Sequence, residues 1–166
     1  RQTSVTMPAV PDETGRFVQP VLSYEYDIAG NRLKSTDALN QTTRTSYNIR
    51  SQPTEIVYPD GTSERYIYNL DGTVASHRAT NGMVTHYEYD ILGRVITKKC
   101  TSCSNAYTTY SEYKGKHLVS ETDGNGNLTK YRYDHAGRLS EVICGTERSV
   151  FQYDTLGRKT KTISWY

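Results

Sequence analysis

Two cysteines near the middle of the chain have the spacing of a metal or redox motif. Cys100-Thr101-Ser102-Cys103 reads C-x-x-C, but a structural zinc site takes four ligands, which usually include a second such pair. The only other cysteine, Cys144, stands alone 41 residues beyond Cys103. The spacing favours thiols in an elaborated turn, and a local or intermolecular disulfide or a metal site remain as alternatives. The sequence leaves the redox state of the three cysteines open.

A second segment resembles the start of a calcium loop. Asp123-Gly124-Asn125-Gly126-Asn127 supplies alternating oxygen ligands, and Asp134 falls at the twelfth position. An EF-hand requires Gly at the sixth position, where this chain has Leu128, and a bidentate Glu at the twelfth. We therefore interpret the segment as a glycine-rich turn and predict no metal ligands.

The remaining reactive side chains do not form a catalytic set. The four histidines (His77, His86, His117 and His135) are scattered and accompany no Ser or Cys nucleophile with an orienting acid. We predict that the chain is not an enzyme, that it has no catalytic residues, and that it binds no cofactor.

A repeat accounts for most of the sequence. Tyr followed by Asp or Asn recurs six times, with a degenerate seventh copy at Tyr113-Lys114, and the tyrosines are spaced by 21, 21, 21, 24, 20 and 20 residues. Gly stands three residues after the Asp or Asn in five copies, and Ser51 takes its place in another. The predicted structural signature comprises Tyr26, Asp27, Gly30, Tyr47, Asn48, Tyr68, Asn69, Gly72, Tyr89, Asp90, Gly93, Tyr133, Asp134, Gly137, Tyr153, Asp154 and Gly157.

Each unit has the pattern of a β-hairpin. Aromatic residues alternate ahead of the Asp, as in Tyr131-Arg132-Tyr133, and alternate residues share one face of a strand. The Asp-x-x-Gly that follows predicts a turn, because the carboxylate can accept backbone N–H groups and Gly permits a positive φ. A second turn lies in mid-unit, as at Asn81-Gly82. We therefore expect valine to be tolerated less well at Gly93, in a phased turn, than at Gly115 in the degenerate copy.

These hairpins predict an all-β fold: a strip of about seven tandem antiparallel β-hairpins over residues 24–166. Residues 1–23 hold three of the five prolines and no Tyr, so we expect an irregular leader or linker there. Strands about 4.8 Å apart would place Cys144 about 19 Å from the Cys100–Cys103 segment, too far for a disulfide.

Composition supports a tyrosine-rich sheet. Leu, Ile, Val and Phe make up only 30 of the 166 residues, but there are 15 tyrosines and the net charge is only +2. Tyr suits a pleated, half-buried surface. Acidic residues are interleaved with the basic ones, which argues against a nucleic-acid partner, and no apolar run is long enough to span a membrane.

The repeat, which recurs about every 20 residues, resembles the motif of the YD-repeat, or Rhs-repeat, family. One copy of it reads Tyr131-Arg132-Tyr133-Asp134-His135-Ala136-Gly137-Arg138-Leu139. That resemblance implies that the strip curves as part of a hollow β-shell. Bacterial members (Rhs polymorphic toxins, the Tc toxin cocoon component and wall-associated proteins) enclose a C-terminal toxin, and animal teneurins use a similar shell for adhesion. The Asp-Pro self-cleavage site of bacterial members has no counterpart here.

The resemblance implies a structural function. We expect a segment of an Rhs-like shell that encloses or displays a toxin or effector polypeptide, whose partners are the rest of the shell and that polypeptide, in a secreted or cell-surface protein. The alternative is a cell-surface adhesion or carbohydrate-binding module that binds glycans through its tyrosine-rich face. The sequence does not identify the cargo, the glycan, the shell closure or the oligomeric state.

Overall fold

The computed structural model describes residues 3–11, 13–19, 21–101 and 106–166. Within them it contains strands and turns and no helix, so no helix could cross a membrane. The all-β prediction is confirmed. The strands are β1 (Ser4–Thr6), β2 (Val10–Pro11), β3 (Phe17–Val18), β4 (Val21–Tyr26), β5 (Arg32–Thr36), β6 (Thr42–Tyr47), β7 (Pro53–Val57), β8 (Ser63–Tyr68), β9 (Val74–Arg78), β10 (Val84–Tyr89), β11 (Val95–Thr101), β12 (Tyr107–Lys114), β13 (His117–Thr122), β14 (Leu128–Tyr133), β15 (Leu139–Cys144), β16 (Glu147–Tyr153) and β17 (Lys159–Trp165).

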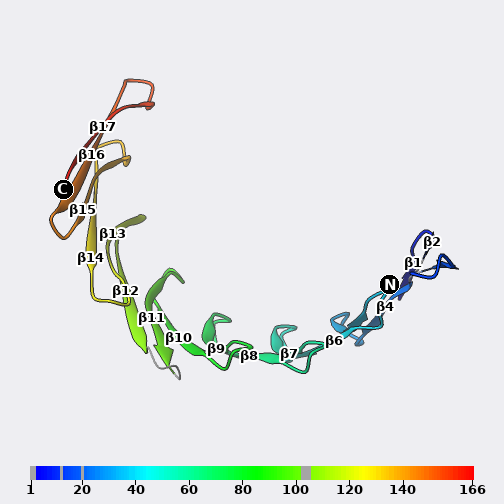
Figure 1. Cartoon of the computed structure of the whole chain (residues 1–166). Coiled ribbons are helices and arrows are strands. Elements are labelled where there is room, and N and C mark those ends of the chain that lie inside the picture. The colour runs from blue at the N-terminus through cyan, green and yellow to red at the C-terminus, as the bar shows by residue number, and fades with distance from the viewer. Residues whose placement is uncertain (1–2, 12, 20, 102–105) are drawn as a thin grey trace. The chain divides into compact units, whose positions relative to one another are not determined.

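The chain forms two compact units, Arg1–Val84 and Thr85–Tyr166. In the first, the sheet order is β1-β4-β5-β6-β7-β8-β9, and β2 and β3 form a separate hairpin. In the second, β10 to β17 follow one another in chain order. Figure 1 shows the hairpins succeeding one another within each unit. This topology results from short turns, which can join only neighbouring antiparallel strands.

The N-terminal segment contributes to the first sheet. Ser4, Val5 and Thr6 of β1 pair antiparallel with β4, and the Tyr24 N–H donates to the Thr3 carbonyl at 2.8 Å. Residues 1–23, expected to be an irregular leader, thus include in their described part three short strands and the first residues of β4. The outer edge of β4 has backbone groups available for pairing, and a short extended segment satisfies them whatever its side chains are.

Burial alternates along the strands as the repeat predicts. In β14, Tyr131 and Tyr133 are half-buried while Arg132 is exposed, and β4 repeats this pattern with Tyr24, Glu25 and Tyr26. Residues that face each other in an antiparallel pair project on the same side of the sheet. One face therefore carries the tyrosines, and the opposite face carries charged residues.

Ion pairs link strands on the charged face. Lys34 pairs with Glu25 at 2.8 Å, and Arg65 pairs with Glu55 at 2.9 Å. Glu141, only 6% exposed, contacts both Arg132 and Arg148. A buried carboxylate is tolerated when cations and hydrogen bonds compensate the loss of water, as the two arginines do here.

The sheet has almost no apolar core. Among the described residues, Cys100 is the one fully buried hydrophobic side chain, and Thr85 and Glu141 are the buried polar ones. The fold therefore depends on backbone pairing and on contacts between successive hairpins. At the Tyr-Asp turns, side chains make some of these contacts through hydrogen bonds to the neighbouring hairpin.

Candidate functional site at the Tyr-Asp corners

We define a Tyr-Asp corner as the second tyrosine of the motif, the Asp or Asn after it, and the next four residues. In the corner at Asp134, the carboxylate Oδ1 accepts the backbone N–H groups of Ala136 and Arg138, each at 2.9 Å. The Gly137 N–H donates to the Asp134 carbonyl at 2.9 Å. A short acceptor side chain followed by a residue tolerant of positive φ closes such a turn locally. The turn within the corner is therefore closed by five consecutive residues, Asp134 to Arg138.

The glycine position of every corner has a left-handed backbone. The five corner glycines have φ between 75° and 97°, and Ser51 adopts φ 60° in the corner that lacks glycine. A residue with a Cβ is strained in this region. The mid-unit turns repeat the geometry, with Asn40 also at φ 60°.

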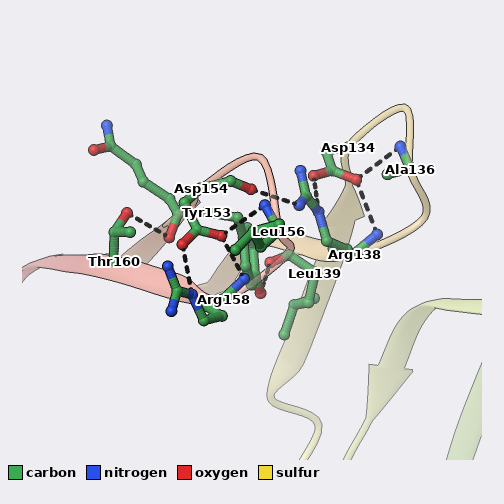
Figure 2. Close-up of polar contacts among 10 residues, drawn as sticks. Asp134, Ala136, Arg138, Leu139, Tyr153, Asp154, Leu156, Arg158 and Thr160 are labelled. Carbon is green, nitrogen blue, oxygen red and sulfur yellow. Dashed lines mark hydrogen bonds and ion pairs between the residues drawn. The ribbon is translucent and has the colours of Figure 1, made fainter.

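The arginine at the end of the corner joins one hairpin to the next. Arg138 Nε donates to Asp134 Oδ2 at 2.7 Å, and its Nη1 donates to the carbonyl of Asp154 in the following corner at 3.3 Å. Figure 2 shows this arginine between the two corners. The guanidinium also lies over the Tyr153 ring, 4.7 Å from the centroid. The planar guanidinium suits this combination of a carboxylate, a carbonyl and an aromatic face.

Other corners make the same link with variations. Arg94 bonds Asp90 Oδ2 at 2.7 Å, donates to the Gly115 carbonyl at 2.5 Å, and lies 4.2 Å from the Tyr113 ring centroid. In the first unit an amide replaces the guanidinium: Gln52 Nε2 donates to the Gly72 carbonyl at 2.9 Å. The degenerate copy at Tyr113 thus accepts the link from the preceding corner although it has no Asp.

The tyrosine of the corner bonds in the opposite direction along the chain from the arginine, to the preceding hairpin. The Tyr153 hydroxyl donates to the Leu139 carbonyl, at the start of β15, at 2.7 Å (Figure 2). The same bond forms in three other corners, from Tyr47 to Arg32 at 3.2 Å, from Tyr68 to Pro53 at 2.8 Å and from Tyr133 to Leu118 at 2.9 Å. Each of these corners is therefore bonded to the hairpin before it.

An irregularity in strand pairing accompanies these tyrosines. The register shifts immediately before Tyr26, Tyr47, Tyr68, Tyr113, Tyr133 and Tyr153. A β-bulge bends its strand and redirects the side chain next to it. The bulge explains how a tyrosine of the sheet face can reach a backbone carbonyl about 15 residues back.

The corner aspartates are acceptors and not acids. Hydrogen bonds from Asn31, Arg94, Arg138 and Arg158 hold the pKa values of Asp27, Asp90, Asp134 and Asp154 below their usual range. Bonds to the charged form of a carboxyl favour that form. These carboxylates therefore remain ionised at neutral pH and accept the hydrogen bonds that close the turn.

Two glutamates lie on the tyrosine face. The Tyr66 hydroxyl donates to Glu64 at 2.5 Å, and His77 Nε2 lies 3.3 Å from the same carboxylate oxygen. These contacts lower the pKa of Glu64, and burial followed by the bond to Glu64 raises the pKa of Tyr66. Tyr131 donates to Glu121 in the same way, and burial followed by this bond raises the pKa of Tyr131 to about 12. Both carboxylates are satisfied by neighbouring side chains.

No group of three or more metal-ligating side chains occurs in the described part of the chain. Asp123 uses its carboxylate for the backbone N–H groups of Asn125 and Asn127 and for the Asn127 side chain, as a turn requires. Cys100 lies within β11 instead of a loop, Cys144 is a free thiol at the end of β15, and Cys103 is outside the described residues.

All seventeen signature residues lie in these corners. Their role as a structural signature stays a prediction, and sequence reasoning missed the links made by the tyrosine hydroxyls and the arginines. A usable signal for the arginines existed, since Arg stands four residues after Asp at Arg94, Arg138 and Arg158. No comparable signal identified the acceptor carbonyls.

Tandem hairpins, locally closed corners and links to both neighbours define a class of protein, the YD-repeat β-shell proteins. The family model described as Teneurin YD-shell matches residues 14–165, and the chain belongs to that family. The predicted resemblance is confirmed.

Curated relatives include toxins. The chain is 35% identical over 135 residues to double-stranded DNA deaminase toxin A of Burkholderia cenocepacia (strain H111), covering 80% of this chain and 8% of that protein. It is 30% identical over 183 aligned residues to tRNA nuclease WapA of Bacillus subtilis (strain 168), covering 86% of this chain and 8% of that protein. The chain thus spans less than a tenth of either relative. The deaminase and nuclease activities in these names belong to those proteins.

A solved structure shares the fold. The crystal structure of TcdB2-TccC3-TEV aligns with a TM-score of 0.71 at 22% identity, over 91% of this chain and 10% of that chain. This likeness supports the hairpin-strip architecture.

Proposed function

We propose that this chain is a wall segment of a larger YD-repeat shell that encloses or displays a toxin or effector polypeptide. Family membership and the relatives named as toxins support this role. On this proposal the segment is not itself an enzyme, its partners are the rest of the shell and the enclosed polypeptide, and the protein is secreted or exposed on a cell surface.

The observation that carries the proposal is the two-way link at the corners. Arg138 bonds forward to the Asp154 carbonyl, and Tyr153 bonds back to the Leu139 carbonyl. Each repeat is therefore stabilised mainly by its neighbours, as in other repeat proteins. An array of coupled repeats with almost no apolar core can cover a large area with a thin sheet. This property suits the wall of a shell better than a compact binding domain.

Protease protection in a longer protein that carries this segment tests the proposal. Mass spectrometry of a limited digest should find the non-repeat domain intact while the shell is folded, and digested once urea has opened the shell. The same domain expressed alone is the matched control. Equal cleavage of the enclosed and the isolated domain, or a coding sequence without such a domain, would refute the role.

Adhesion through glycans stays a prediction. Four tyrosine hydroxyls already donate to backbone carbonyls, and Tyr66 and Tyr131 donate to glutamates. A glycan array comparing the unaltered chain with Tyr87→Ala addresses this alternative, and the absence of any sugar signal would count against it.

A further inference from the structure

The glycine-rich turn between β13 and β14 contains an asparagine followed by glycine, Asn125-Gly126, and both residues are exposed. An asparagine side chain in such a pair can react with the main chain, because glycine has no Cβ to shield its amide nitrogen. The sequence has one other pair of this kind, Asn81-Gly82, in the turn between β9 and β10. The two turns can therefore be compared directly.

The backbone of the two turns is bonded in the same way. The Gly126 N–H donates to the Asp123 carbonyl at 3.0 Å, and the Gly82 N–H donates to the Ala79 carbonyl at 2.9 Å. In either turn the glycine nitrogen is released only when the turn opens locally. Gly126 is exposed whereas Gly82 is half-buried, so the nitrogen is the more accessible one at Gly126.

The asparagine side chains of the two turns are held differently. The Asp123 carboxylate accepts the N–H groups of Asn125 and Asn127, and the Asn125 side-chain amide makes no hydrogen bond with the described part of the chain. In the other turn no aspartate is present, and Asn81 Oδ1 itself accepts the Met83 N–H at 3.0 Å. The amide of Asn125 is thus free to turn toward the backbone, and that of Asn81 is tied in place.

We propose that Asn125 is a site of spontaneous modification, at which asparagine is converted to aspartate and isoaspartate. The Gly126 nitrogen forms a bond to Asn125 Cγ, and the side-chain nitrogen leaves as ammonia together with the Gly126 proton. The product is a cyclic imide, in which the glycine nitrogen is bonded to two carbonyl carbons. Water then cleaves one of these two bonds. Cleavage at Cγ gives aspartate, and cleavage at the original backbone carbonyl gives isoaspartate, whose main chain runs through Cγ.

The two products affect the turn differently. Aspartate at this position suits the fold, because Asp60 occupies the equivalent place in the turn between β7 and β8 and accepts a backbone N–H there at 2.9 Å. Isoaspartate adds a methylene group to the main chain between the two bonds that close the turn, Gly126 N–H to the Asp123 carbonyl and Asp123 N–H to the Asn127 carbonyl. We therefore expect isoaspartate to weaken the adjacent pairing of β13 with β14. This inference does not depend on whether the segment belongs to a shell.

Incubation of the full chain at mildly alkaline pH and body temperature tests the proposal. Peptide mapping by mass spectrometry follows the conversion of Asn125 and Asn81 over time, and a protein isoaspartyl methyltransferase with a labelled methyl donor counts isoaspartate. Asn125 should convert about fivefold faster than Asn81, because the hydrogen bond of Asn81 has to break before its amide can react.

A matched pair of variants assigns the methylation signal. Asn125→Ser removes the reactive amide at an exposed turn position that serine accommodates, and most of the signal should disappear. Asn81→Ser is the control, since serine can still accept the Met83 N–H, and it should retain most of the signal. In the converted chain, separated by its added negative charge, hydrogen exchange should be faster in β13 and β14 than in the unconverted chain, and Asn125→Asp should not show this acceleration.

Three results would overturn the proposal. The first is equal or faster conversion at Asn81, which would mean that the Met83 N–H activates the amide instead of restraining it. The second is no conversion at Asn125 in the folded chain while the urea-unfolded chain converts, because the turn would then prevent ring closure. The third is an undiminished methylation signal in Asn125→Ser, which would place the isoaspartate elsewhere.

Discussion

Removing one tyrosine hydroxyl tests whether the corners couple neighbouring hairpins. Tyr68 is half-buried, and its hydroxyl donates to the Pro53 carbonyl at 2.8 Å. Tyr68→Phe keeps the ring in the sheet and removes only this bond. A neutral hydrogen bond contributes about 0.5–1.5 kcal/mol, so we expect a loss near 1 kcal/mol.

Two assays report that loss. In urea, with a denaturant slope of about 2 kcal/mol per molar, the unfolding midpoint should fall by about 0.5 M. Because an array of repeats need not unfold in one step, hydrogen exchange gives the local measurement. Exchange should accelerate about fivefold in β7 and β8, which the bond connects, if the opening free energy falls by about 1 kcal/mol.

Tyr24→Phe is the matched control. Tyr24 is the first tyrosine of its motif, it is also half-buried, and its hydroxyl makes no hydrogen bond with the part of the chain that the structure describes. Its midpoint should stay within the error of the measurement. Equal shifts for Tyr68→Phe and Tyr24→Phe would refute the link, because the effect would then come from any lost hydroxyl.

Three further predictions concern the turns. The pKa of the corner carboxyl groups is lowered in the folded protein, so the stability they contribute is fully present above the ordinary pKa of 3.8 and is lost as the pH falls through the lower folded pKa. Asp134→Asn should therefore make the melting temperature less sensitive to acid. An unchanged pH profile of the melting temperature would contradict this. Ser51→Gly should raise stability by about 0.5–1 kcal/mol in urea unfolding by relieving φ 60°, while Ser46→Gly within strand β6 should lower it by a similar amount; a loss at both positions would count against strain at Ser51. Gly124→Ala should destabilise the second unit measurably, because its Cβ would lie 2.9 Å from atoms of the Tyr107 side chain, and an unaltered melting temperature would show that the ring moves freely.

One expectation from the sequence changes with the structure. Gly93 was expected to be more sensitive to valine than Gly115 because it occupies a phased turn. Both glycines have positive φ, 75° and 57°, and in both an added Cβ meets nothing within 4 Å. The penalty for valine at either position is therefore backbone strain of similar origin, and no clear difference between the two is now expected.

The sequence by itself determined the hairpins and their phase. Asp134 reaches the N–H groups of Ala136 and Arg138, only two and four residues away, so the turn needs no information from distant parts of the chain. The strands follow from the alternation of residues such as Tyr131 and Tyr133. Interactions this short in sequence can be read directly from residue types and their spacing.

Only the tertiary structure decided what each corner contacts. Tyr153 reaches back 14 residues to Leu139, and Arg138 reaches forward 16 to Asp154, in directions set by the bulge before Tyr153 and by the register of the neighbouring strands. The addition of β1 to β4 and the enclosure of Glu141 by two arginines likewise depend on which strands pair. Backbone carbonyls and sheet edges are the same for every residue type, so side-chain patterns alone do not reveal which of them a distant group will meet.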